Sequence, residues 1–150
     1  MRVVLQRVLE SVVLAIEEVD RREVGRIGAG ILALVGFTAG DDEGAVGWMA
    51  SKIADLRLFP GEGGAMDRSL RETGGGLLLV SQFTLYADTR RGRRPDFTAA
   101  APYAEAKRLF ERFREACEAE LPGRVASGLF GARMEVALVN DGPVTLVLDR

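Results

Sequence analysis

The chain has 150 residues, of which 47% are hydrophobic and 28% are charged, a balance typical of one soluble globular domain with a substantial core. It has no histidine, which excludes Ser–His and Cys–His nucleophile pairs and any metal site with histidine ligands. One cysteine excludes an intrachain disulfide, and a net charge of −2 provides no overall attraction for nucleic acid. We therefore expect a single cytoplasmic domain over residues 1–150, with no metal, no cofactor and no membrane-spanning segment.

The N-terminal part of the chain predicts strands connected by short turns. Residues 3–9 and 12–16 are rich in valine and leucine without helical periodicity, and they predict one long strand or two shorter ones. The charged residues 17–23 predict a solvated hairpin turn, which leads into a short return strand at residues 24–27. Residues 31–37 are almost entirely apolar, as expected for a central strand of a sheet.

Two amphipathic helices are predicted. The first begins at Asp41 or Asp42, whose carboxylates can cap the helix and interact favourably with its dipole. Its apolar residues recur at spacings of three and four: Val46, Met49, Ile53 and Leu56. The second begins near Pro102 and ends at Pro122-Gly123, with an apolar face formed by Tyr103, Ala106, Phe110, Phe113 and Cys117. Because buried free cysteines are common, we expect Cys117 to be a core residue and not a nucleophile.

Shorter elements complete the predicted fold. Residues 56–59 predict a short strand, and residues 60–76, with six glycines, predict mostly loop. Residues 77–80 predict another buried strand, and residues 134–139 and 144–148 predict two strands near the C-terminus. This order predicts a sheet-rich α+β domain with β/β/α layers, in which the two main helices pack on one side of the sheet.

The strand at residues 77–80 is followed by side chains that can form hydrogen bonds. Thr84 is a candidate hydroxyl nucleophile, with Ser81 and Gln82 as residues that could orient it or stabilise an oxyanion. If the strand continues regularly, Gln82 and Thr84 lie on the same face. The alternative is an ordinary core strand followed by a solvated loop.

A basic loop follows these polar residues. It contains four arginines within five positions, flanked by Tyr86 and Phe97: Arg90, Arg91, Arg93 and Arg94. Such a loop can bind phosphates, and the aromatic residues can stack on bases. The alternative is a solvated loop that Asp88 and Asp96 hold in place. The preceding glycines at 74–76 do not form a phosphate-binding loop, because they lead into a strand and no GK[ST] follows.

The two C-terminal strands are joined by Asn-Asp-Gly-Pro at residues 140–143, which are residue types of a tight turn. Pro143 cannot donate a hydrogen bond to a sheet, so we expect it to begin the last strand or to lie outside it. Most X–Pro bonds in folded proteins are trans, and the residues alone therefore predict a trans Gly142–Pro143 bond.

Two of these segments together resemble the D-aminoacyl-tRNA deacylases, also called D-tyrosyl-tRNA deacylases. Residues 81–85 read SQFTL, which is similar to one signature of that family, and residues 140–145 read NDGPVT, which is similar to its second signature. The resemblance covers nearly the whole chain and includes further residues in the same order: Met1-Arg2, Gln6-Arg7-Val8, YADTR at 86–90, GRRP at 92–95, Phe130-Gly131-Ala132 and Met134.

The resemblance implies a homodimer that hydrolyses the ester between a D-amino acid and the 3′ end of tRNA, with the active site at the dimer interface. It implies a cis Gly142–Pro143 bond, contrary to the residues alone, and a Gly-Pro pair that reaches into the partner's pocket and excludes L-amino acids sterically. Arg7 would hold this segment. The residues that it implies in the pocket are Ser81, Gln82, Phe83 and Thr84 on the catalytic wall, and Phe130 and Met134 near the terminal adenosine.

Two mechanisms are compatible with this resemblance. In one, Thr84 is the nucleophile; in the other, the 2′-hydroxyl of the terminal ribose activates water while the protein positions the groups. The absence of histidine favours the second, because it leaves Thr84 poorly activated. Two rival functions are a small-molecule esterase or amidase that uses Thr84, and a non-catalytic dimeric RNA-binding module that uses the arginine loop.

Overall fold

The computed structural model describes residues 1–17 and 20–150, which form one mixed sheet, one small hairpin and the helices that cover them. The strands are β1 Arg2–Glu17, β2 Asp20–Ile27, β3 Gly30–Gly36, β4 Arg57–Pro60, β5 Met66–Ser69, β6 Gly76–Ser81, β7 Val125–Ser127 and β8 Met134–Asp149. The helices are α1 Glu43–Asp55, α2 Leu70–Thr73, α3 Tyr103–Glu120 and the 3₁₀ helix η1 Phe83–Tyr86. None of the described helices is long and apolar enough to cross a membrane.

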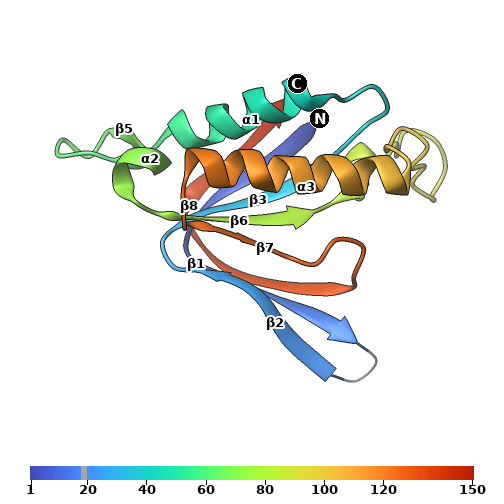
Figure 1. Ribbon diagram of the computed structural model, residues 1–150, viewed down its shortest axis with the longest axis horizontal. Helices are drawn as coiled ribbons and strands as arrows, with labels where there is room; N and C mark the ends of the chain where they lie inside the picture. Colours follow the sequence, from blue (N-terminus) through green and yellow to red (C-terminus); the bar gives the residue numbers. More distant parts are fainter. Residues whose placement is uncertain (18–19) are drawn as a thin grey trace.

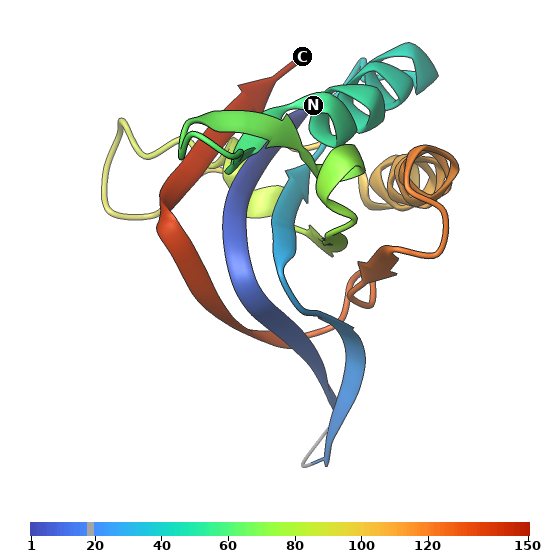
Figure 2. The ribbon, with the colours of Figure 1, turned by 90° about the vertical axis from the view of Figure 1, so that its left-hand side faces the viewer.

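The long strand β1 organises the six-stranded sheet. It pairs antiparallel with β8 along one edge, and along the other edge with β3 and then with β2. On the far side of β3, the strands β6 and β7 continue the sheet in parallel. Figure 2 shows that β1 and β8 curve strongly, so that their lower halves and β2 bend away from the layer beneath the helices.

Both faces of the central strands are buried. Ile31, Leu77 and Leu79 point into a large core beneath α1 and α3, whereas Leu32 and Leu78 belong to a second cluster on the opposite face, inside the bend of the sheet. The two helices lie side by side over one face (Figure 1). These layers confirm the predicted sheet-rich α+β domain.

The helix ends and faces follow the sequence closely. Asp42 caps α1, because its carboxylate accepts a hydrogen bond of 2.8 Å from the backbone N–H of Ala45. In α3, Phe110, Phe113 and Cys117 are buried as predicted, and burial raises the pKa of the Cys117 thiol. The prediction for Tyr103 is wrong, since its side chain is 65% exposed at the first turn of α3.

Three other local predictions are wrong. Residues 60–76 contain β5 and α2, and Ser69 and Glu72 form a capping box at the start of α2. Residues 20–23 belong to β2 and not to a turn, whereas residues 18–19 of the predicted turn lie outside the described residues. The two predicted C-terminal strands form one strand, β8, because the segment around Asn140 bulges but stays on β1.

Candidate functional site

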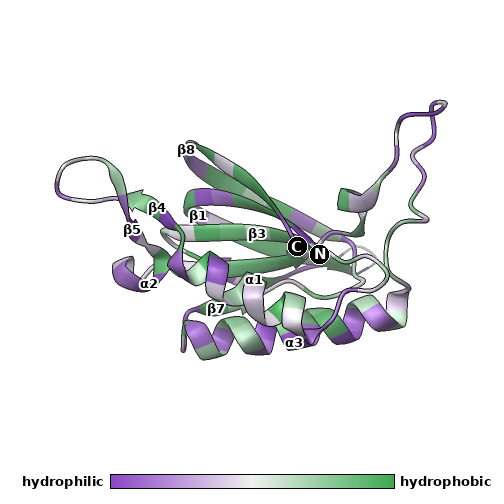
Figure 3. Cartoon of the chain, turned by 90° about the horizontal axis from the view of Figure 1, so that it is seen from above, coloured by the Kyte–Doolittle hydropathy of each residue, from purple (hydrophilic) through white to green (hydrophobic). Residues whose placement is uncertain are grey.

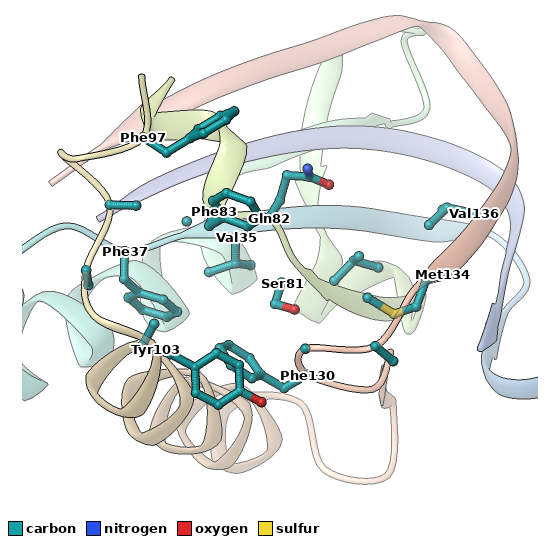
Figure 4. A pocket seen from close by; sticks show the side chains of 17 residues that line it. Val35, Phe37, Ser81, Gln82, Phe83, Phe97, Tyr103, Phe130, Met134 and Val136 are labelled. Atoms are coloured by element: carbon teal, nitrogen blue, oxygen red, sulfur yellow. The ribbon is translucent and has the colours of Figure 1, made fainter. Parts of the chain in front are cut away.

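A cavity of about 630 Å³ opens where β6 and η1 face the N-terminal turn of α3. Figure 4 shows Ser81, Gln82 and Phe83 on one wall and Phe130 and Met134 on the other. Every lining residue is uncharged: Val35, Gly36, Phe37, Val80, Ser81, Gln82, Phe83, Phe97, Ala100, Ala101, Tyr103, Ala106, Phe130, Gly131, Ala132, Met134 and Val136. The cavity therefore suits an apolar or aromatic group, and it supplies hydroxyl and amide groups for hydrogen bonding.

The wall that carries Ser81, Gln82 and Phe83 forms where the pairing of β6 with β3 ends. Ser81 is the last residue of β6, opposite Val35 of β3, and the N–H of Gln82 donates a hydrogen bond of 2.7 Å to the Val35 carbonyl. Beyond that point the chain turns into η1, so the strand does not continue regularly through Thr84. The turn leaves Phe83 58% exposed, with its ring edge-to-face against Phe97 at 5.1 Å between centroids.

Thr84 is close to this wall but does not line the cavity. The amide of Gln82 hydrogen-bonds to the Thr84 hydroxyl, so the two side chains meet through the 3₁₀ turn and not as neighbours on one face of a strand. Among the described residues, no carboxylate or amine forms a hydrogen bond with this hydroxyl. The hydroxyl therefore lacks the adjacent general base that activates a nucleophile.

The opposite wall comes from α3, the segment before β8 and the first residue of β8, Met134. The ring of Phe130 packs against Tyr103 at 5.3 Å and against Phe110 at 5.6 Å between centroids, which fixes its position. Gly131 has a φ of +77°, and a Cβ there would lie 2.5 Å from the Tyr103 hydroxyl oxygen. Glycine therefore suits this position both for its backbone conformation and for its closeness to Tyr103.

Gly142, Pro143 and Arg7 do not line this cavity. The Gly142–Pro143 bond is cis, so the trans prediction from the residues is wrong and the expectation from the family resemblance is confirmed. The Arg7 Nε lies 2.8 Å from an Asp141 carboxylate oxygen and donates to the Asp141 carbonyl oxygen at 3.2 Å. Its Nη1 donates to the Leu58 carbonyl oxygen, so one side chain connects this segment to β4.

The outer side of η1 is held by the terminal strands, which sequence reasoning did not connect with the site. Arg2 donates hydrogen bonds of 3.1 Å to the Leu85 carbonyl oxygen and 2.7 Å to Asp149, and its guanidinium lies 5.3 Å from the centre of the Tyr86 ring. Burial, followed by the nearby charge of Asp41, raises the pKa of Tyr86 to about 12. Tyr86 therefore stays neutral and supports the packing of η1.

The structure brings together five of the predicted site residues and separates the other four. Ser81, Gln82, Phe83, Phe130 and Met134 line one cavity, whereas Thr84 lies behind its wall. The lining residues that sequence reasoning missed include Val35, Phe37 and Tyr103. Their apolar patterns were read only as strand or helix core, and no local motif distinguishes them. No group of His, Cys, Asp or Glu within residues 1–17 and 20–150 is arranged to hold a metal ion.

Comparisons with known proteins assign this arrangement to a family. D-aminoacyl-tRNA deacylases from Nitratidesulfovibrio vulgaris strain DP4 and Stenotrophomonas maltophilia strain K279a are each 56% identical, and the alignments cover 99% of this chain and 93% and 99% of theirs. The enzyme of the same name from Thermomicrobium roseum is 54% identical, covering 99% of this chain and 94% of its own.

Solved structures agree in fold. A structure described as a c-Myc DNA unwinding element binding protein aligns over 100% of this chain and 99% of its own, with a TM-score of 0.92 and 34% identity. A probable eukaryotic D-amino acid tRNA deacylase aligns over 99% of this chain and 98% of its own, with a TM-score of 0.86 and 20% identity. The family profile described as D-Tyr-tRNA(Tyr) deacylase matches residues 4–149, and the chain therefore belongs to that family.

Proposed function

We propose that this protein hydrolyses the ester bond of D-aminoacyl-tRNA and releases the free D-amino acid and tRNA. The observation that supports this most directly is the uncharged cavity between Ser81, Gln82 and Phe83 on one side and Phe130 and Met134 on the other. Its aromatic wall suits a terminal adenine base, and its polar wall suits an ester, which needs orientation and hydrogen-bond donors more than a charged catalyst. The names of the similar enzymes point to the same reaction.

The proposal includes a second copy of the chain. Gly142 and Pro143 lie outside the cavity of their own chain, so their proposed contact with substrate requires the partner's pocket. Three large apolar side chains on β1 and β8 are exposed, with exposed fractions of 56% for Leu9, 46% for Val139 and 59% for Val147. A homodimer that covers part of this surface would remove these side chains from water.

In the proposed mechanism the protein positions the ester and the substrate supplies the assisting hydroxyl. The residues that line the cavity include no carboxylate, histidine, lysine or arginine, so the cavity wall supplies no side chain of the usual kinds that act as a general base. The 2′-hydroxyl of the terminal ribose is a neighbouring group that can orient and activate water. Phe83 lines the cavity at the start of η1, where the first N–H groups of a helix have no acceptor within the helix. Its N–H is the candidate donor for the developing oxyanion.

The proposed selectivity comes from exclusion. A hydrophobic pocket distinguishes similar side chains only weakly, whereas a clash with fixed backbone rejects the wrong enantiomer. We assign this role to Gly142 and Pro143 of the partner subunit. Asn140 and Arg7 keep the segment in place, because the Asn140 amide donates to the carbonyl oxygens of Arg7 at 2.8 Å and of Val144 at 3.2 Å.

One assay tests this proposal against its two rivals. D-tyrosyl-tRNA, L-tyrosyl-tRNA and a free D-tyrosine ester are incubated with the protein in parallel, and release of tyrosine is measured. We expect rapid release from D-tyrosyl-tRNA alone. Equal turnover of the free ester would support a small-molecule esterase, and tRNA binding without release of tyrosine would support an RNA-binding module.

The Thr84→Ala variant is expected to keep substantial deacylase activity, within about 10-fold of the unmodified protein. Within the described residues the Thr84 hydroxyl contacts Gln82 and no general base, so its loss removes only an interaction that positions the wall. The measurement is the single-turnover rate on D-tyrosyl-tRNA, with circular dichroism and tRNA binding as controls. Complete loss of turnover in a folded variant that binds tRNA would instead identify Thr84 as the nucleophile.

Glycyl-tRNA is expected to be hydrolysed, because glycine has no side chain for the Gly142–Pro143 segment to exclude. The rate is measured at increasing enzyme concentration beside L-alanyl-tRNA and D-alanyl-tRNA, each of which differs from glycyl-tRNA by one methyl group. Resistance of glycyl-tRNA at enzyme concentrations that deacylate D-alanyl-tRNA completely would contradict steric exclusion as the basis of selectivity.

A further inference from the structure

The loop at residues 88–96 carries a positive charge on an acidic protein. Four arginines and two aspartates give it a formal charge of +2, so the rest of the chain, with its total of −2, carries −4. Figure 3 shows this hydrophilic loop projecting away from the sheet and the helices. Positive charge that is concentrated on one projecting loop attracts a polyanion to that loop and away from the remaining surface.

Both aspartates of the loop already have partners. Asp88 accepts hydrogen bonds from the Arg90 guanidinium at 2.6 and 2.9 Å, and these bonds lower the pKa of Asp88. Asp96 accepts a hydrogen bond of 2.8 Å from the N–H of Thr98. The remaining three arginines are exposed, and no carboxylate of residues 1–17 or 20–150 forms an ion pair with them: Arg91, Arg93 and Arg94.

The base of the loop is fixed at the rim of the cavity. Asp88 and Asp96 exchange backbone hydrogen bonds of 2.7 and 2.9 Å, which close the loop. The next residue, Phe97, lines the cavity and packs against Phe83. Arg94 and Phe97 are three positions apart in the chain, so their Cα atoms lie within about 11 Å of each other.

We propose that Arg91, Arg93 and Arg94 bind phosphates of the tRNA acceptor end while its 3′ terminus occupies the cavity, an inference that rests on the proposed function. A substrate whose ester lies in the cavity has its next phosphates at the rim, where these three arginines form no ion pair with any described residue. Contacts of this kind set position and affinity without reading the base sequence. The loop therefore contributes to substrate capture, whereas the cavity determines chirality.

The test uses the double variant Arg93→Gln/Arg94→Gln. Its matched control is Lys52→Gln/Arg114→Gln, which removes the same charge from exposed positions on α1 and α3. The substrates are D-tyrosyl-tRNA, a D-tyrosyl minihelix that contains only the acceptor stem, and 3′-O-D-tyrosyl-adenosine, which has no phosphate. For each protein, kcat/KM is measured over a series of salt concentrations.

We expect the loop variant to lose about 10-fold or more in kcat/KM on tRNA and minihelix at 0.1 M salt. The slope of log kcat/KM against log salt should become less steep by about 1.5 to 2, as for two lost phosphate contacts. Its activity on the adenosine ester should equal that of the unmodified protein, and the control variant should match the unmodified protein on all three substrates.

Three results would overturn this assignment. An equal loss in both double variants would show a general charge effect, and a loss on the adenosine ester would show that the loop shapes the cavity. An effect on tRNA that disappears on the minihelix would place the contacts elsewhere in tRNA. If the unmodified protein did not hydrolyse D-tyrosyl-tRNA, the proposed function itself would be refuted. That outcome differs from all three, because each of them requires an active unmodified protein.

Discussion

Replacement of Gly30 by alanine is expected to lower the free energy of unfolding by more than about 3 kcal/mol. Gly30 of β3 lies opposite Gly76 of the parallel strand β6, and a Cβ at Gly30 would lie 2.0 Å from the Gly76 carbonyl oxygen and 2.7 Å from its nitrogen. Both obstacles are backbone atoms, which cannot rotate away, so the two strands must separate. The measurement is urea unfolding followed by circular dichroism.

Two neighbouring glycines provide a graded control. A Cβ at Gly28 meets no atom within 4 Å, so Gly28→Ala should be neutral or stabilising by up to about 1 kcal/mol. At Gly76 the nearest obstacle is the Ile27 side chain at 2.8 Å, and Gly76→Ala should therefore fall between the other two variants. If Gly30→Ala were as stable as Gly28→Ala, the close approach of β3 and β6 would be wrong. If Gly30→Ala does not fold, the intermediate loss at Gly76 still tests the geometry.

Most of the fold was predictable because most of its helices and strands have a characteristic pattern in their own local sequence. The apolar run at residues 31–37 and the periodic apolar residues of α1 and α3 identified the central strand and both helices. The failures involve long-range pairing. The strand β8 continues past Asn140 and Pro143 because its backbone stays on β1, and the Asn140 side chain is held by the carbonyl of Arg7, a contact across 133 positions. No local sequence pattern indicates which distant residue such a side chain will contact.

The site was predictable where its residues are adjacent in sequence. The motif at residues 81–84 indicated a polar wall. It did not indicate the shape of that wall, because β3 ends at Gly36 and the chain after Ser81 therefore has no neighbouring strand to pair with. Phe37 and Tyr103 reach the same cavity from separate elements and carry no signal except hydrophobicity. The cis bond before Pro143 was likewise predicted only from the family resemblance and not from the residues themselves.

Replacement of Arg7 by alanine is expected to reduce kcat/KM on D-tyrosyl-tRNA by about 100-fold, because small displacements of groups that position a substrate have effects of that size. Arg7 contacts Asp141 with its Nε and the Leu58 carbonyl with its Nη1, and its side chain is only 12% exposed. Without it, the proposed selective segment Gly142–Pro143 loses its connection to β4. We expect stability to fall by about 1–3 kcal/mol, as for lost hydrogen bonds to a charged group.

The decisive readout for Arg7 is the ratio of kcat/KM for D-tyrosyl-tRNA to that for L-tyrosyl-tRNA. A displaced Gly142–Pro143 segment excludes L-amino acids less well, so this ratio should fall in Arg7→Ala. It should fall by less in Arg7→Lys, which keeps the positive charge, but whose single ammonium group cannot reproduce both contacts of the guanidinium. The matched control is Arg26→Ala, which removes an exposed ion pair of 2.7 Å with Glu23 and should change stability by less than about 1 kcal/mol. An unchanged ratio in an Arg7 variant that is merely less stable would restrict Arg7 to a structural role and would remove the support for steric selection by this segment.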